Sequence, residues 1–227
     1  MVTGGGKGIG AAVCARFVED DVASVGRTRG EVDEVCDVTD EEAVVALFER
    51  LGPVDVLVNN AGIAESAPLA RTTLADWQRQ LDVNVTGAFL CTRAVVPGMV
   101  DRGFGRVVTI ASTAGLAGAR YVAAYAASKH AAVGLMRAVA AEVAGTGVTA
   151  NAVCPTYVRT PMTERTLDRI TETTDRSREE ALAGLEASTG LGRLLEPQEV
   201  ADAVWYLASN AAAAVNGHAL VLDGGGG

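Results

Sequence analysis

Short apolar segments alternate with helical patterns along the whole chain, and this rhythm limits the possible folds more than any other feature. An apolar run followed by an amphipathic helix, repeated several times, is typical of β-α-β units, which build a parallel sheet with right-handed crossovers. The sequence therefore predicts an α/β fold, a doubly wound parallel sheet with helices on both faces, in one domain spanning 1–227. Strands are expected at 1–2, 22–26, 36–38, 54–58, 106–110, 149–154 and 219–222, and helices at 11–18, 40–50, 74–99, 121–144 and 196–209.

A glycine-rich turn precedes the first helical pattern. It reads Thr3-Gly4-Gly5-Gly6-Lys7-Gly8-Ile9-Gly10. Its glycines allow a tight turn and a close backbone approach, and the helix that follows offers free N–H groups and a positive dipole end to a pyrophosphate. The spacing G-x-x-x-G-x-G differs from G-x-G-x-x-G, and such loops also serve as plain turns. Its position directly before a helix favours a dinucleotide-binding, Rossmann-like turn.

The segment after the second predicted strand bears on which dinucleotide is bound. It reads Gly26-Arg27-Thr28-Arg29 and contains no acid. A carboxylate at this point usually holds a free ribose 2′-hydroxyl, whereas Arg suits a 2′-phosphate, and Lys7 adds a second cation. NADP(H) is therefore favoured over NAD(H).

The connection that follows Arg27 is short. Only nine residues separate Arg27 from Asp37, which leaves no room for a crossover helix. Two explanations remain open at this point, a chain that is abbreviated here and a sequence from which residues are missing.

Polar residues follow two of the predicted strands. Asn59-Asn60-Ala61-Gly62 comes after the strand at 54–58, and Ser112 comes after the strand at 106–110. Ligands of open α/β sheets bind outside the carboxyl ends of the strands, so these residues are expected to form one wall of a cofactor and substrate site. The alternative for the first group is an Asn-rich turn.

Tyr125 and Lys129 stand four residues apart in a predicted helix, which places both side chains on one face. A cation beside a phenol favours the phenolate, so we expect a lowered pKa for Tyr125 and a role as general acid/base. The alternative is a pair of surface side chains. Asn84 interrupts the long helix at 74–99, where it indicates either a local kink or a functional amide.

Composition excludes several classes of function. Asp and Glu outnumber Lys and Arg by 28 to 19 without a basic cluster, so binding to nucleic acid or to an anionic membrane surface is not expected. No apolar run reaches the length of a membrane span and no signal peptide is indicated, so the cytoplasm is the expected location. The four cysteines lack C-x-x-C spacing and accompany only two histidines, which argues against a metal site and against a disulfide framework.

Taken together, these residues resemble the short-chain dehydrogenase/reductase family, in the family's order and over nearly the whole chain. The resemblance implies a catalytic tetrad of Asn84, Ser112, Tyr125 and Lys129. In it, Tyr125 transfers the proton to or from the substrate oxygen, Ser112 hydrogen-bonds that oxygen, Lys129 contacts the nicotinamide ribose and Asn84 holds a water of a proton relay. It also implies cofactor contacts at Asp37, Val38, Asn60, Ala61, Gly62, Pro155, Val158 and Thr160, and no metal. The family's usual Pro-Gly is Pro155-Thr156 here, a departure beside the expected nicotinamide position.

The resemblance further implies an oxidoreductase that transfers a hydride between NADP(H) and a ketone or secondary alcohol. The stretches 151–155 and 111–115 are most similar to those of 3-oxoacyl thioester and polyketide ketoreductases. The alternatives are an NAD-dependent hydroxyacyl or secondary-alcohol dehydrogenase and a cofactor-binding scaffold with little turnover. A sugar-nucleotide epimerase or dehydratase shares Tyr-x-x-x-Lys but usually needs a longer chain.

Two expectations concern the outer parts of the molecule. The polar, charged segment 160–192 is either a solvated helical excursion or, as the resemblance implies, a substrate lid. A homotetramer is expected through the helices at 74–99 and 121–144, which carry the small apolar residues Val122, Ala124, Ala132 and Ala138.

Overall fold

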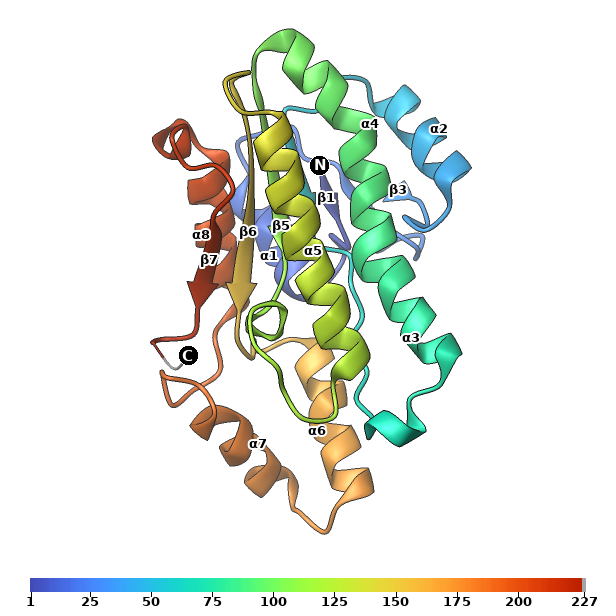
Figure 1. Ribbon diagram of the computed structural model, residues 1–227, viewed down its shortest axis with the longest axis vertical. Coiled ribbons are helices and arrows are strands. Elements are labelled where there is room, and N and C mark those ends of the chain that lie inside the picture. The colour runs from blue at the N-terminus through green and yellow to red at the C-terminus, as the bar shows by residue number, and fades with distance from the viewer. Residues whose placement is uncertain (226–227) are drawn as a thin grey trace.

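Seven parallel strands form the centre of the molecule, which the computed structural model describes over residues 1–225. Their order is β3-β2-β1-β4-β5-β6-β7, so the direction in which the chain adds strands reverses between β1 and β4 (Figure 1). Ligands of such sheets bind at this reversal, outside the carboxyl ends of the strands. The predicted doubly wound parallel sheet is confirmed. The strands are β1 (Val2–Thr3), β2 (Ser24–Gly26), β3 (Glu34–Val35), β4 (Val56–Asn59), β5 (Gly105–Ile110), β6 (Val148–Pro155) and β7 (Ala219–Leu222).

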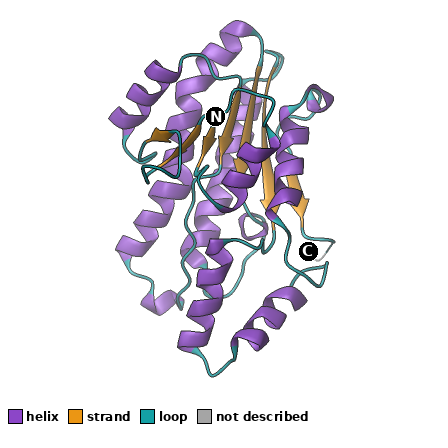
Figure 2. Ribbon diagram, turned by 180° about the vertical axis from the view of Figure 1, so that it is seen from behind, coloured by secondary structure: helices purple, strands orange, loops and turns teal. Residues whose placement is uncertain are grey.

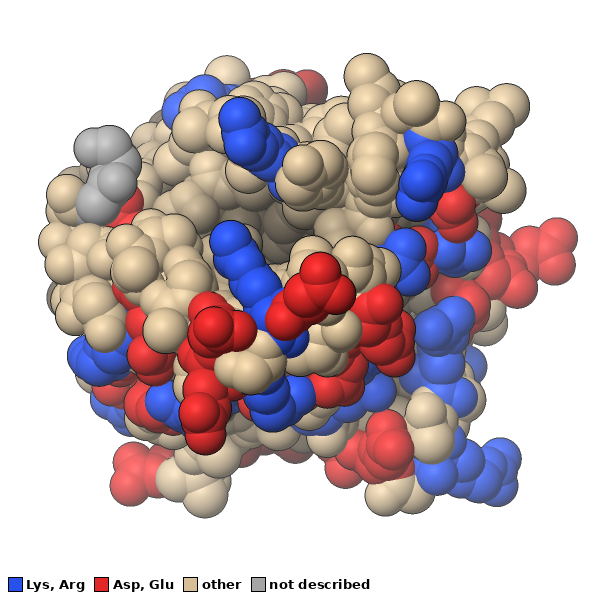
Figure 3. Space-filling view, turned by 90° about the horizontal axis from the view of Figure 1, so that it is seen from below, with Lys and Arg blue, Asp and Glu red and all other residues tan. Residues whose placement is uncertain are grey.

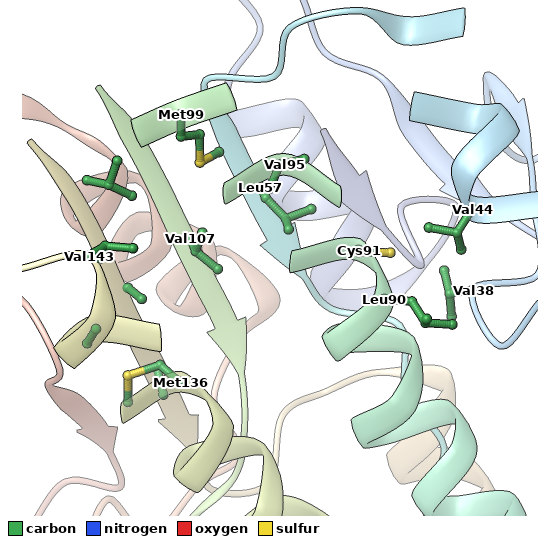
Figure 4. Close-up of a cluster of buried hydrophobic side chains, with 14 of the residues drawn as sticks. Val38, Val44, Leu57, Leu90, Cys91, Val95, Met99, Val107, Met136 and Val143 are labelled. Atoms are coloured by element: carbon green, nitrogen blue, oxygen red, sulfur yellow. The ribbon is translucent and has the colours of Figure 1, made fainter. Parts of the chain in front are cut away.

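One face of the sheet is covered by α2 (Glu41–Leu51), α4 (Gly87–Arg102) and α5 (Ala123–Glu142). Figure 4 shows Leu57 of β4 beside Val95 of α4, and Leu90 of α4 beside Val38, in the cluster that also contains Val107 and Met136. All the residues of β5 and β6 are buried, because helices cover both faces of these central strands. This core holds the carboxyl ends of β5 and β6 in fixed positions.

The opposite face is covered by α1 (Gly8–Arg16) and α8 (Pro197–Ala208), which is the side seen in Figure 2. Val13 of α1 and Val200 and Val204 of α8 pack on Val58 and Val108 of the sheet. The packing of Val13 against the sheet fixes α1, and with it the glycine turn that leads into this helix.

The long predicted helix is continuous but not uniform. It comprises α3 (Leu74–Leu81), a π-helical turn η2 (Asp82–Thr86) and α4. A π-turn inserts an extra residue into the helix, so the local irregularity expected at Asn84 is present. Such turns are frequent at functional sites. By length and composition the stretch 74–102 would suit a membrane span, but its apolar residues Leu90, Val95 and Met99 belong to the core.

The third strand begins earlier in the chain than the sequence predicts. β3 is Glu34–Val35, so the strand predicted at 36–38 is placed too late along the chain. The seven residues 27–33 form a loop with no helix, as their number requires.

Residues 160–192 contain two helices, α6 (Pro161–Thr173) and α7 (Arg178–Ala187), at the lower end of the molecule in Figure 1. A small separate core of Leu167, Ala181, Leu185 and Leu194 joins them. Thr160 caps α6 by accepting a hydrogen bond from the Thr163 N–H. Short turns complete the described chain at η1 (Leu69–Arg71), η3 (Thr113–Gly115) and η4 (Asn210–Ala212).

Candidate active site

Tyr125 and Lys129 lie one turn apart on α5, at the carboxyl edge of the sheet. The Lys129 Nζ is 5.8 Å from the centre of the Tyr125 ring and donates a 2.8 Å hydrogen bond to the carbonyl oxygen of Ile110. Lys129 is only 6% exposed, so the alternative of a pair of surface side chains does not apply. The last residue of β5 therefore anchors the ammonium beside the phenol.

Burial changes the pKa of both groups. Desolvation lowers the pKa of Lys129 to about 8, because the charged form loses water. Desolvation raises the pKa of Tyr125, and a hydrogen bond with Ser112 offsets this only in part. The expected lowering of the Tyr125 pKa by Lys129 is thus not found. The reason is that Lys129 is directed to the Ile110 carbonyl rather than to the phenol oxygen.

Ser112 follows β5 and faces the same space. Its hydroxyl accepts a 3.2 Å hydrogen bond from the Ala114 N–H, which fixes the start of η3. The same side chain lies close enough to Tyr125 to favour the ionised phenol and lower its pKa in part. The structure therefore brings together the Ser112 and Tyr125 that the sequence predicted.

Asn84 in η2 joins this group through three hydrogen bonds. Its Oδ1 accepts from the Ile63 N–H at 2.8 Å, and its Nδ2 donates to the Ile63 carbonyl and to the Ser128 hydroxyl, both at 2.9 Å. A Cβ added to Gly62 would lie 3.2 Å from Asn84 Oδ1 and 3.6 Å from Lys129 Nζ. Asn84 thus ties the segment after β4 to the catalytic helix, with Gly62 between them.

The glycine turn leaves room for a dinucleotide by excluding side chains. A Cβ at Gly10 would lie 2.1 Å from the Gly4 carbonyl oxygen, so no other residue fits there. Gly4 and Gly8 have φ values of 66° and 56°, which favour glycine. Lys7 is the N-cap of α1 and makes no side-chain capping bond, so the first N–H groups of the helix remain open to a phosphate.

Thr3, Asn60 and Ala61 hold the turn against β4. The Thr3 hydroxyl accepts from the N–H groups of Asn60 and Ala61, both at 3.0 Å. The Asn60 Nδ2 donates to the carbonyls of Thr3 and Gly4 at 2.9 and 3.1 Å. These bonds hold the segment predicted as a cofactor wall against the glycine turn, and they engage the Thr3 hydroxyl and the Asn60 amide nitrogen within the protein.

Arg27 and Asp37, both predicted as cofactor contacts, lie near each other. Arg27 lies 3.8 Å from the carboxylate of Asp37 and is 70% exposed. Burial disfavours the charged form of Asp37, but hydrogen bonds from Thr39 and the charge of Arg27 together leave its pKa below the ordinary value. Val38, predicted as a cofactor contact, is buried, and a Cβ at Gly87 would lie 2.7 Å from its Cγ2. The structure therefore gives Val38 a packing role.

The end of β6 lies opposite the glycine turn. Val158 is buried, and its carbonyl accepts hydrogen bonds from the Thr160 and Thr163 hydroxyls. A Cβ at Gly8 would lie 3.3 Å from the Thr160 methyl group, so the start of α6 borders the turn. Thr156 stands where the family usually has glycine. Its N–H donates a hydrogen bond to the Leu222 carbonyl, so the pairing of β6 with β7 continues through Thr156.

Several contributors to the site were not predicted. The Ile63 and Ile110 backbones hold Asn84 and Lys129, and no side-chain signal could have indicated them. Tyr157, two residues after Pro155, lies close enough to raise the pKa of Tyr125. Its position directly after the last residues of β6 is a signal that could have placed it at the substrate end.

The remaining predictions concern metals and thiols. Within residues 1–225 no cluster of His, Cys, Asp and Glu could hold a metal ion. Cys14, Cys36, Cys91 and Cys154 are all unpaired, and three of them are buried.

A glycine turn at a helix N-terminus, a parallel sheet and a buried Tyr-Lys pair define a dinucleotide-dependent oxidoreductase. Comparisons with known proteins agree with this class. Residues 6–226 match the family described as enoyl-(acyl carrier protein) reductase. The chain belongs to the short-chain dehydrogenase/reductase family.

Its relatives include two named reductases of similar length. A Streptomyces coelicolor protein described as a ketoacyl reductase is 38% identical, with 99% of this chain and 95% of the relative covered. A 3-oxoacyl-(acyl carrier protein) reductase of Thermotoga maritima is 34% identical, with 99% and 96% covered. A solved structure of actinorhodin polyketide ketoreductase with NADPH superposes with a TM-score of 0.91 at 38% identity, covering 100% of this chain and 95% of the other.

Proposed function

We propose that this oxidoreductase uses NADPH to reduce the ketone of a 3-oxoacyl thioester or polyketide-type substrate. The observation that carries the proposal is the meeting of Ser112, Tyr125, Lys129 and Asn84 beside the glycine turn. The names of the similar ketoreductases support the substrate class. The open helix N-terminus at Lys7 and the side-chain-free glycines fit the pyrophosphate of a dinucleotide.

In this proposal the chain supplies proton transfer and positioning. When bound, the dinucleotide provides the hydride. Tyr125 donates its phenolic proton to the substrate oxygen, and Ser112 donates a hydrogen bond to the same atom. The phenolate that remains is stabilised by the Lys129 ammonium. Asn84 is a positioning residue, because its three hydrogen bonds hold the Gly62 segment and Ser128 around Lys129.

The test is NADPH oxidation with a panel of ketones that includes 3-oxoacyl thioesters of N-acetylcysteamine, simple β-ketoesters and ketoses. The proposal expects turnover with the thioesters and β-ketoesters. Turnover with ketoses alone would contradict the substrate class. Binding of NADPH without oxidation of any ketone would instead favour the scaffold alternative.

The segment 160–192 is proposed to be the substrate lid. Its helices α6 and α7 pack on each other through their own small core, and Arg178 of α7 pairs with Asp168 and Glu164 of α6. Seen from below in Figure 3, this end of the molecule is hollowed, and charged side chains of both signs border the hollow. A unit with its own core can move as one piece over the site.

A preference for NADPH over NADH is expected, because Lys7 and Arg27 both stand near the adenosine end. The ratio of kcat/KM values for NADPH and NADH should be about tenfold, since two exposed cations each contribute up to about 1 kcal/mol. Arg27→Ala should reduce this ratio about threefold. Asp37 already compensates part of the charge of Arg27, so we expect only a modest change in the cofactor ratio when Arg27 is removed. The same compensation is compatible with the NAD-dependent alternative.

The control for this prediction is Arg102→Ala. Arg102 pairs with Asp55 before β4, at the opposite edge of the sheet, so its removal changes net charge equally but away from the cofactor. Equal kcat/KM values for the two cofactors in the unmodified protein would show that the missing acid after β2 does not indicate NADP use.

A homotetramer is proposed, but its predicted surface needs correction. Ala124 and Ala132 are 3% and 1% exposed because they pack inside their own chain, so they cannot contact a partner. The outer surface of these helices instead carries Phe89, 41% exposed, and the exposed Gly134 and Ala138. Light scattering at micromolar concentration should give four chains of 23.3 kDa each, and Phe89→Glu should lower that mass. A monomer under these conditions would reject the proposal.

A cytoplasmic location is also inferred. Four unpaired thiols, most of them buried, are typical of a protein that works in a reducing compartment.

A further inference from the structure

The C-terminal end of the short loop 27–33 is fixed against β2. The Asp33 carboxylate accepts hydrogen bonds from the Ser24 N–H at 2.9 Å and the Ser24 hydroxyl at 2.6 Å, and these bonds lower its pKa. A Cβ at Gly26 would lie 3.0 Å from the Val32 Cγ1. The loop therefore lies close along β2 and has a defined path in place of a crossover helix.

This path brings Glu31 onto the glycine turn. A Cβ at Gly6 would lie 2.9 Å from the Glu31 carbonyl oxygen and 3.1 Å from the Glu31 Cβ. Gly6 adjoins Lys7, and Glu31 follows Arg27 by four residues. Glu31 is exposed, and over residues 1–225 its carboxylate has neither a salt bridge nor a hydrogen bond. An uncompensated acid thus stands at the adenosine end, where no acid follows β2 directly.

We propose that Glu31 sets the discrimination between NADPH and NADH, in opposition to Lys7 and Arg27. This inference rests on the proposed cofactor site. A carboxylate at this end of a Rossmann-like site accepts a hydrogen bond from a free ribose 2′-hydroxyl and repels a 2′-phosphate. In this chain the acid comes from the shortened loop, five residues after β2 ends, rather than from the position directly after β2 where such an acid usually stands. The site therefore admits both cofactors, and their ratio depends on the charges of Glu31, Lys7 and Arg27, the last of which Asp37 compensates in part.

The test measures binding without turnover. Dissociation constants of adenosine 2′,5′-bisphosphate and adenosine 5′-monophosphate are determined by calorimetry for the unmodified protein, Glu31→Gln and Glu31→Lys, and those of NADPH and NADH by fluorescence. Glu31→Gln should tighten the bisphosphate relative to the monophosphate about threefold to fivefold, as expected for one exposed charge. Glu31→Lys should shift the ratio further in the same direction. Both shifts should shrink as salt increases.

Glu19→Gln is the matched control. It removes the same charge just beyond the far end of α1, away from the glycine turn, and should leave the ratio unchanged. Equal ratios in the unmodified protein and both Glu31 variants would overturn the inference, and so would an equal shift in the Glu19 variant. If the unmodified protein binds NADPH while Glu31 has no effect, only this inference falls. If it binds none of the four nucleotides, the proposed function falls with it.

Discussion

Replacing Tyr125 with Phe should lower kcat by about 10²–10⁴ while leaving the Kd of NADPH within a few-fold. The phenol is the one titratable group in the described site that lies near both Ser112 and the Lys129 ammonium. Phe keeps the aromatic ring and removes only the hydroxyl that carries the transferable proton. Stopped-flow measurement of NADPH oxidation on a β-ketoester separates the chemical step from cofactor binding.

Two variants sharpen this test. Tyr157→Phe removes the other nearby phenol without touching the proposed proton donor, so its kcat should remain within a few-fold of the unmodified protein. Ser112→Ala should reduce kcat less than Tyr125→Phe, because it removes a hydrogen bond rather than the acid. A Tyr125→Phe variant that keeps more than half of kcat would show that Tyr125 is not the proton donor.

The second large effect is expected for Lys129→Met, which should abolish most turnover and yet stabilise the cofactor-free protein. Burial holds the pKa of Lys129 near 8, so at pH 7 the fold carries an unfavourable buried charge. A lowering of the pKa from 10.5 to about 8 corresponds to at most about 3.5 kcal/mol, at about 1.4 kcal/mol per pH unit. Loss of the bond to Ile110 offsets about 1 kcal/mol, so the free energy of unfolding at pH 7 should rise by about 1–2 kcal/mol.

This stabilisation should depend on pH in a defined direction. Between pH 8 and 10.5 the unfolded chain keeps the Lys129 proton that the folded chain has released, so the unmodified protein gains stability as pH rises. The advantage of Lys129→Met is therefore full below pH 8 and disappears toward pH 10.5. Urea unfolding at several pH values measures it. The chain's other lysine, Lys7, is exposed, and Lys7→Met should show no such gain. If Lys129→Met is less stable at pH 7, the buried charge is not the dominant cost.

The sequence by itself determined the sheet and the identity of the clustered side chains. Alternating apolar and amphipathic segments require crossovers, and crossovers place every strand's carboxyl end on one edge. The sequence therefore predicts that Ser112 after β5 and the Tyr125-Lys129 pair on the next helix lie close together, and they do. The glycine turn is also predicted by the sequence, because only glycine fits where the backbone segments approach each other so closely.

Only the tertiary structure decided the properties that depend on surroundings. The direction of the Tyr125 pKa shift follows from burial and from the Ile110 carbonyl that holds Lys129, and neither is encoded in the spacing of the pair. Backbone partners such as Ile63 carry no side-chain signature, so the bonds of Asn84 could not be foreseen. Ala132 faces inward because packing against the rest of the chain, not its small size, determines which side of a helix is free. Glu31 reaches the glycine turn because a loop too short for a helix must lie against the sheet, and its path depends on contacts that a linear sequence does not contain.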